Sequence, residues 1–417
     1  MTKTVKVRDA VALYVASVLG GGVLVLPSLL AETAGPAAII SWILVTLLSL
    51  PISIMFGRLC AQYPDAGGMS GFVRRAFGTH SGNLTGWLYF FVLPIGQPAI
   101  ALTGVYYFAF LLDLSDEAIV ALAYTILVVA IVLGLLGKRL NATIQTGIIL
   151  AIMAVLVGAS AVGLSQMEVE NFTPFNPHGL LAIGSGVALI LWSYIGVENL
   201  SFISSDFEDP KRDFLRSVLI GTGVVAVLYL LTSVVTIGVL SPAEWGAVKA
   251  PFALIVDRSI GFGSAFVVVV VSLFISLAGA IAIVWGGSNL CMSMGRSGSL
   301  PAAFGEETKR GVPRRAIFFL WGMYSVSVLA IYAFGLDLGT LAKIVGATVL
   351  MTYMASALAY LKLMRTERWS ALLTLTGCLA LLPFFGSALW YPAGIVLAYL
   401  AYATLKRQAR PIGIPGE

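Results

Sequence analysis

The sequence predicts an all-α integral membrane protein with twelve transmembrane helices in a single domain over residues 1–417. Its residues are 59% hydrophobic, with a mean hydropathy of +0.96, and only 11% are charged, whereas a soluble protein carries about 25% charged residues. So little charge cannot cover the surface of a water-soluble domain of this size. Apolar runs of about 20 residues, the length that crosses a bilayer, also recur along the chain. The twelve runs are 9–31, 36–57, 84–112, 117–137, 142–164, 180–203, 215–240, 261–293, 315–335, 338–362, 370–387 and 389–405.

The loops between these spans alternate in charge. One side carries lysines and arginines such as Lys6, Arg74 and Arg212, and the other carries acids such as Glu168 and Glu244. Because positively charged loops resist translocation, we expect both termini to be cytoplasmic and the chain to lie in the cell inner (plasma) membrane. The pI near 9.0 then reflects topology, and we expect no nucleic-acid partner.

The first span contains VLGGGVLVLP, residues 18–27. This stretch lies in the middle of the span, where a membrane helix most needs its backbone hydrogen bonds. Gly20, Gly21 and Gly22 each disfavour a helix by about 1 kcal/mol relative to alanine, and Pro27 lacks a backbone donor. Close helix packing through small residues is the ordinary explanation of such a motif. An interrupted helix is the alternative.

The sixth span contains a matching polar stretch, WSYIGVEN, which includes Trp192, Ser193, Ile195 and Gly196. Unwound backbone at membrane depth is tolerated only inside protein or along a cavity. Interrupted spans at corresponding positions of two halves point to the binding site of a transporter. Spans 1 and 6 fit two inverted repeats of five spans, residues 1–165 and 178–363, with spans 11 and 12 (369–406) outside them.

A broken helix would expose backbone N–H groups at the positive end of a helix dipole, which suits a carboxylate. The carbonyl groups at the other helix end would suit an ammonium group. A zwitterionic amino acid matches both, so we expect a small-molecule amino acid as the substrate.

Three further residues in the spans have two readings each. Glu198 is an acid well inside a span, where burial disfavours the charged form, so it is either a proton-coupling group or a structural acid. Gln97, in the span 3 stretch LPIGQPA, either reaches the cavity or bridges helices. Trp192 is either a flat lid over the bound side chain or an ordinary packed tryptophan.

The spans contain no carboxylate pair, no metal-ligand cluster and no nucleophile with a base, so we expect neither an enzyme nor a metal site. No P-loop motif is present, which argues against direct use of ATP. We expect no cofactor, a lipid bilayer as the surroundings, and a proton as the coupling ion. The oligomeric state stays open.

Three segments carry a family resemblance. Residues 64–78, PDAGGMSGFVRRAFG, resemble the loop between spans 2 and 3 of the amino acid–polyamine–organocation (APC) transporter superfamily. WSYIGVEN with residues 206–212, DFEDPKR, resembles its span 6 and the following loop, and residues 294–301, MGRSGSLP, resemble the end of its span 8. The order is that of the family and covers essentially the whole chain. The length and LPIGQPA look most like bacterial exporters of methionine and branched-chain amino acids.

The resemblance implies a LeuT-like fold with alternating access. It implies a substrate carboxylate at the backbone of the three glycines and an ammonium on carbonyl groups near Val18 and around Trp192, Ser193 and Ile195. Trp192 corresponds to a gating aromatic residue, and Glu198 to a proton-sensing acid, in relatives that exchange arginine for agmatine.

Two features depart from the family pattern. Span 5 has no lysine to replace a sodium ion, and Gly21 stands where many members have a serine, so no hydroxyl is offered to the carboxylate. No acid beyond Glu198 is available in the expected cavity for a basic substrate side chain, and no arginine for an acidic one. We therefore expect export of neutral hydrophobic L-amino acids (Met, Leu, Ile, Val) by proton antiport. Proton-coupled uptake and amino acid exchange are the alternatives that the residues leave open.

Overall fold

The computed structural model describes residues 7–19, 21–63, 68–112, 114–137, 142–196, 210–309 and 311–408, and these residues form helices and connecting loops without a strand. The α-helices are α1 (Val7–Val18), α2 (Leu26–Ala34), α3 (Ala38–Gln62), α4 (Gly68–Phe77), α5 (Thr79–Phe90), α6 (Leu93–Ala109), α7 (Asp116–Leu135), α8 (Ala142–Gly163), α9 (Leu180–Ile190), α11 (Pro210–Val239), α12 (Pro251–Ile260), α13 (Phe262–Arg296), α14 (Arg314–Phe334), α15 (Leu338–Leu363), α16 (Trp369–Phe385) and α17 (Trp390–Gln408). Short 3₁₀ helices interrupt the chain at η1 (Gly21–Leu24), η2 (Gly35–Ala37), η3 (Leu164–Gln166), η4 (Val169–Phe172), η5 (Leu191–Tyr194), η7 (Ala302–Gly305) and η8 (Gly386–Leu389).

Within the described ranges, nine helical segments are long and apolar enough to cross a bilayer. They are Leu26–Gln62, Thr79–Ala109, Asp116–Leu135, Gly147–Gln166, Arg212–Val239, Gly263–Arg296, Arg314–Phe334, Leu338–Leu363 and Trp369–Lys406. The all-helical membrane class is thereby confirmed. The last segment joins predicted spans 11 and 12, with η8 between α16 and α17, and the described part of span 6 gives only Leu180–Tyr194. The count of twelve spans stays a prediction.

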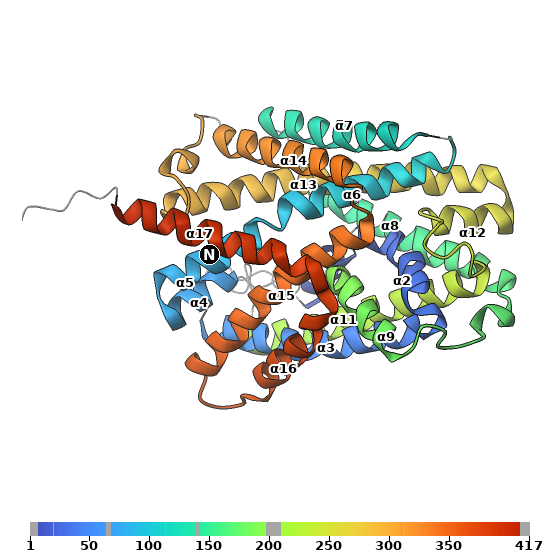
Figure 1. Ribbon diagram of the computed structural model, residues 1–417, viewed down its shortest axis with the longest axis horizontal. Coiled ribbons are helices and arrows are strands. Elements are labelled where there is room, and N and C mark those ends of the chain that lie inside the picture. The colour runs from blue at the N-terminus through green and yellow to red at the C-terminus, as the bar shows by residue number, and fades with distance from the viewer. Residues whose placement is uncertain are drawn as a thin grey trace, which may run out of the picture.

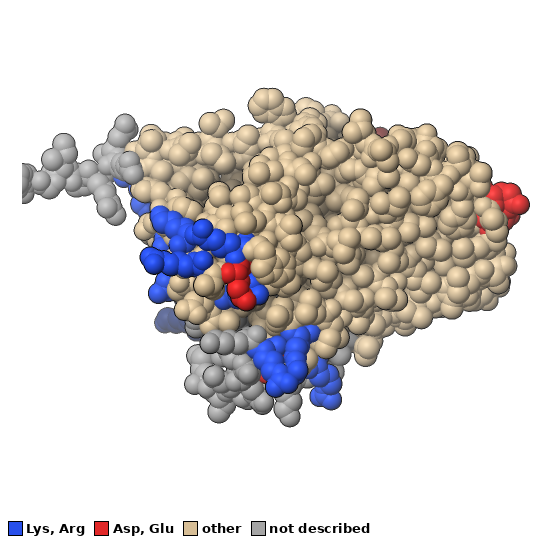
Figure 2. All heavy atoms as spheres, turned by 90° about the horizontal axis from the view of Figure 1, so that it is seen from below, with Lys and Arg blue, Asp and Glu red and all other residues tan. Residues whose placement is uncertain are grey.

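Most helices run along the long axis of the molecule, which is horizontal in Figure 1. In the face that Figure 2 shows, lysines and arginines gather toward one end with a small acidic patch among them, acids alone lie at the opposite end, and an uncharged belt separates the two ends. Large apolar side chains such as Leu47, Val227 and Phe274 are more than half exposed. An exposed apolar surface between two charged ends fits a protein that is surrounded by lipid. We call these ends the basic end and the acidic end.

Three long helices organise the interior. Helix α11 packs on α1, α2, α3 and α8; α13 packs on α6, α7, α8 and α14; and α15 packs on α4, α6, α9 and α16. Trp42 of α3 is fully buried with its ring 4.7 Å from that of Tyr229 of α11, and such an aromatic pair adds about 0.5–1.5 kcal/mol beyond its buried area. The broken segments of spans 1 and 6 are held between these helices.

Predicted span 3 is two helices, because α5 ends at Phe90 and α6 begins at Leu93. Pro94 stands in the first turn of α6, where its missing N–H costs no helix bond. The carbonyl of Phe91, between the two helices, accepts a hydrogen bond of 2.8 Å from the Tyr391 hydroxyl of α17. The expected kink around LPIGQP therefore begins just upstream of it.

Candidate functional site

The first predicted interruption is present in the structure. Helix α1 ends at Val18, η1 starts at Gly21, and α2 begins only at Leu26. Gly21 and Gly22 open η1, and the first N–H groups of a helix have no acceptor inside it. Two glycine N–H groups are therefore presented at a helix start inside the protein. Gly20 lies outside the described residues.

The second interruption lies in the span 6 segment. Helix α9 ends at Ile190 and continues as η5 to Tyr194, after which Ile195 is extended (φ −70°, ψ 130°). Gly196 follows with φ of +143°, a backbone conformation that side chains other than glycine rarely adopt. The helix thus stops within the WSYIGVEN stretch. Glu198 lies outside the described residues.

One tyrosine joins the two interruptions. The hydroxyl of Tyr229, in the middle of α11, lies 3.0 Å from the carbonyl oxygen of Val18 and 3.0 Å from that of Ser193. These carbonyl groups end α1 and lie in η5, so both belong to helix ends with partial negative charge. A hydroxyl has one proton to donate, so it can satisfy only one of the two carbonyl oxygens at a time, and the other remains able to accept a hydrogen bond. Two carbonyl oxygens therefore converge on one buried position.

An aromatic ring lies against the glycines of the first break. A Cβ atom added to Gly22 would meet Cζ3 of Trp192 at 3.4 Å and Cδ1 of Leu26 at 3.4 Å. Trp192 itself is only partly buried. Its ring is thus close to the backbone of η1, and a side chain larger than alanine at position 22 would displace it.

Other hydrogen bonds fix the two short helices. Tyr107 of α6 donates to the carbonyl of Leu24 at 2.7 Å, and the hydroxyls of Tyr194 and Thr46 form a hydrogen bond between η5 and α3. The hydroxyl of Ser193 donates to the carbonyl of Ile190 at 2.6 Å. Ser193 therefore offers its carbonyl at the site, because its hydroxyl already completes the end of α9.

Gln97 of α6 is 1% exposed, and neither its Nε2 nor its Oε1 atom has a hydrogen-bond partner among the described residues. A buried polar group without a partner costs about 1–3 kcal/mol, so it calls for an explanation. If Gln97 bridged two helices, as one of the two sequence-based readings proposes, its amide would have a protein partner. No such partner is found among the described residues.

The structure thus brings together Val18, Gly22, Trp192 and Ser193, with Gly21 and Ile195 adjacent to them in the chain. It connects Gln97 to none of them by a hydrogen bond. Sequence reasoning missed Tyr229 and Tyr107. Each could have been found as a hydroxyl group in the middle of an apolar span, because such a group must find a hydrogen-bond partner inside the protein.

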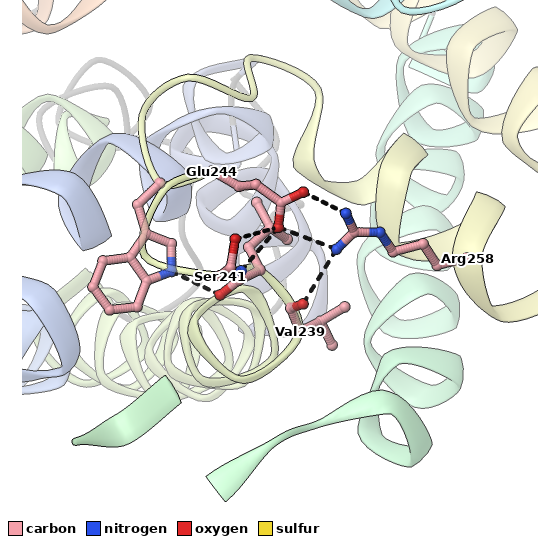
Figure 3. Close-up of polar contacts among 6 residues, drawn as sticks. Val239, Ser241, Glu244 and Arg258 are labelled. Atoms are coloured by element: carbon pink, nitrogen blue, oxygen red, sulfur yellow. Dashed lines mark hydrogen bonds and ion pairs between the residues drawn. The ribbon is translucent and has the colours of Figure 1, made fainter. Parts of the chain in front are cut away.

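A loop at the acidic end is hydrogen-bonded to the first turn of α2, the helix that follows the first break, and Figure 3 shows the polar contacts around Glu244 in this loop. The backbone N–H of Gly246 lies 3.1 Å from the side-chain oxygen of Ser28, which donates to the carbonyl of Val248 at 2.9 Å. In the same loop, Glu244 accepts bonds from the N–H and hydroxyl of Ser241 and forms an ion pair with Arg258 of α12. Arg258 also donates to the carbonyl of Val239, so α11, the loop and α12 are joined.

This ion pair predicts a pH-dependent stability. The Arg258 guanidinium, through its hydrogen bonds, lowers the pKa of Glu244 from its ordinary value. A lowered pKa in the folded state means that the stabilisation is complete above the ordinary glutamate value and is lost as the pH falls through the lowered one. We expect Glu244→Gln to lower the melting temperature at pH 7 and to match the unsubstituted protein in strong acid.

Melting curves of the detergent-solubilised protein between pH 7 and pH 3 measure this difference. Glu306→Gln is a control, because the Glu306–Arg315 pair is more than half exposed on both sides and such pairs contribute little. A Glu244→Gln difference that stays constant across the pH range would contradict the prediction.

Comparison with known proteins places the chain among transporters. The family model described as amino acid permease matches residues 6–405. The chain is 34% identical to the uncharacterized amino acid permease YecA of Bacillus subtilis, over 95% of this chain and 93% of that protein. It is 28% identical to the L-methionine/branched-chain amino acid exporter YjeH of Escherichia coli, over 97% of each. It is also 28% identical to the putrescine transporter PotE of Haemophilus influenzae, over 72% of this chain and 70% of that one.

Proposed function

Because the chain belongs to the amino acid permease family, we propose that it is a secondary transporter that exports neutral hydrophobic L-amino acids, such as methionine, leucine, isoleucine and valine, by proton antiport. Membership of this family makes it a permease and not an enzyme. The observation that carries the proposal is the meeting of the Val18 and Ser193 carbonyl oxygens at the Tyr229 hydroxyl.

The two ends of an amino acid fit the two kinds of helix end. The substrate ammonium binds the carbonyl oxygens of Val18 and Ser193, with the backbone of Ile195 and Gly196 alongside, where the partial charge is negative. The carboxylate binds the N–H groups of Gly20, Gly21 and Gly22, at a helix start with partial positive charge. Since the middle glycine offers no hydroxyl, carboxylate recognition rests on the main chain alone.

The surroundings favour a neutral apolar side chain. No aspartate or glutamate is buried among the residues that the structure describes, so these residues supply no counter-charge for a second amino group. Putrescine, which the relative PotE is named for, has two such groups and no carboxylate. Trp192 acts as the gate, since its ring lies against Gly22 and can cover a bound side chain. The orphaned amide of Gln97 is available to a ligand in the loaded state.

The proposal includes the LeuT-like arrangement of ten spans in two inverted repeats, with spans 11 and 12 outside them. Two contacts support it: η1 lies against η5, and α2 lies against α9, so the interrupted segments of the two halves are neighbours. The basic end faces the cytoplasm with both termini, by the charge rule for loops. The membrane is the cell inner membrane.

Glu198 is the proposed proton-coupling group, because it follows the second break directly. We expect Glu198→Gln to remove the dependence of net efflux on a pH gradient, since an amide cannot carry the proton. Counterflow between equal substrate pools requires no net movement of protons, so it stays largely intact.

Proteoliposomes loaded with labelled leucine or methionine measure both activities, with and without a pH gradient and with and without sodium. Glu170→Gln, an exposed acid of the loop before span 6, is the control. A gradient response that survives Glu198→Gln would contradict the proposed coupling. Accumulation driven by inward proton flow would favour uptake, and transport that occurs only with substrate on both sides would favour exchange.

A further inference from the structure

Two adjoining grooves lie at the basic end, where three candidate spans terminate. The spans beginning at Thr79 and ending at Arg296 and Lys406 bring α5, the loop after α13, and α17 together (Figure 1). A polar groove of about 290 Å³ is lined by Thr79, His80, Asn83, Ser299, Tyr402 and Lys406, among others. Because transmembrane spans end at the membrane surface, this groove lies at the level of lipid headgroups.

The second groove is apolar. It encloses about 390 Å³ and is lined by Leu300, Pro301, Ala302 and Leu405. Tyr402 and Lys406 line both grooves, so the two are continuous at these side chains. A polar compartment joined to an apolar one is the shape that an amphiphile fills.

Lys406 brings a positive charge to the polar groove, and no aspartate or glutamate is among the residues that line it. Lys406 Nζ donates to the carbonyl of Gly298 at 2.5 Å, and Arg74, which lies behind the lining, donates to Oδ1 of the lining residue Asn83 at 3.3 Å. Both acceptors are neutral, and no ion pair links either cation to a carboxylate among the described residues. The Nε atom of Arg74 is buried with no partner there. Basic pockets between spans are typical sites for anionic headgroups.

The groove also has oriented donors. Thr79 opens α5, which follows Gly78 without a side-chain cap, and the first N–H groups of a helix point outward without an acceptor in the helix itself. A helix start of this kind attracts phosphate. Tyr402, whose ring lies 5.9 Å from Lys406 Nζ, has the amphipathic side chain that is enriched at membrane interfaces.

The MGRSGSLP segment builds the floor of this groove. Gly298 has φ of +73°, and a Cβ there would lie 3.1 Å from Lys406 Nζ. The Ser299 hydroxyl donates to Asn83 Oδ1 at 2.8 Å, and its carbonyl accepts from Trp87 Nε1 at 2.8 Å. The segment therefore fixes Asn83 and the carbonyl that positions Lys406.

We propose that the two grooves bind one anionic phospholipid of the adjacent leaflet, with its phosphate at Lys406 and the start of α5 and an acyl chain along Leu300 and Leu405. The charge at this end (Figure 2) favours an anionic over a zwitterionic headgroup. The site is separate from the helix breaks, so the bound lipid anchors the protein in the leaflet or regulates transport and does not take part in substrate binding.

The test uses the full-length protein in detergent, titrated with phosphatidylglycerol, phosphatidylcholine or inorganic phosphate, with bound lipid counted by native mass spectrometry. We expect phosphatidylglycerol to bind and to raise the melting temperature, and Lys406→Gln to weaken this binding about fivefold, the factor that one interfacial lysine contributes. Lys362→Gln is the matched control, an exposed lysine of the same end that lies over the Phe77 ring and outside the grooves.

A second variant tests the apolar groove. Ala302→Trp fills it from an exposed position, so it should fold normally, lose bound phosphatidylglycerol and leave Lys406 in place. Equal binding in Lys406→Gln and Lys362→Gln would overturn the proposal. So would equal stabilisation by phosphatidylcholine, or inorganic phosphate binding as tightly as the lipid, which would indicate a free-phosphate site.

Discussion

Replacing Gly22 by valine should lower substrate affinity by roughly 5- to 150-fold. The Cβ position already lies at 3.4 Å from both Trp192 and Leu26, and valine adds two methyl groups beyond it. Overpacking of this kind costs about 1–3 kcal/mol, which corresponds to that range of affinity. The same methyl groups would occupy the space beside the N–H groups that bind the carboxylate. Binding of labelled leucine to the purified protein measures the loss.

Gly22→Ala is the matched control, because its single Cβ sits at ordinary contact distance from the same two side chains. It should keep most of the affinity. A melting temperature for Gly22→Val close to that of the unsubstituted protein would separate loss of binding from loss of folding. Unchanged affinity in a folded Gly22→Val protein would return the glycines to a role in helix packing.

Replacing Tyr229 by phenylalanine should reduce both stability and substrate affinity. The Val18 and Ser193 carbonyl groups would lose the donor that they share, and a buried acceptor without a partner costs about 1–3 kcal/mol. The two helix ends would then repel each other through their partial charges, so the position for the ammonium would be lost. Thermal unfolding measures the loss of stability, and equilibrium binding of labelled leucine measures the loss of affinity.

Tyr107→Phe removes a hydroxyl of equal burial that donates to one carbonyl only, that of Leu24. It should lower stability with a smaller effect on affinity, because Leu24 lies beyond the glycine N–H groups. If both variants lost stability and affinity in the same proportion, Tyr229 would be a structural residue and not a positioning residue for the substrate.

The sequence predicted the positions of both helix breaks, because glycine and proline act through local backbone preferences. Gly21, Gly22 and Gly196 stand where the structure interrupts the helices. The all-helical membrane class followed from composition, which depends on no tertiary contact. Glu198 could be singled out as an acid in an apolar span, but it lies outside the described residues.

Tertiary contacts could not be predicted in the same way. Tyr229 stands within the plain apolar run VVAVLYLLTSVV, and its two acceptors lie 36 and 211 residues away in the chain. No local pattern selects those partners. The structure divides span 3 at Phe91, slightly upstream of the kink that LPIGQP predicts, and the carbonyl at this break is satisfied by Tyr391 from the last helix, a contact that no local pattern reveals.

The position of a bound amino acid tests the central claim most directly. L-Selenomethionine bound to the protein can be located by the anomalous signal of its selenium. We expect the selenium beside Trp192, the ammonium within about 2.7–3.2 Å of the Val18 and Ser193 carbonyl oxygens, and the carboxylate at the N–H groups of Gly21 and Gly22. A ligand bound away from the two breaks, or with its ammonium at the glycines, would contradict the account.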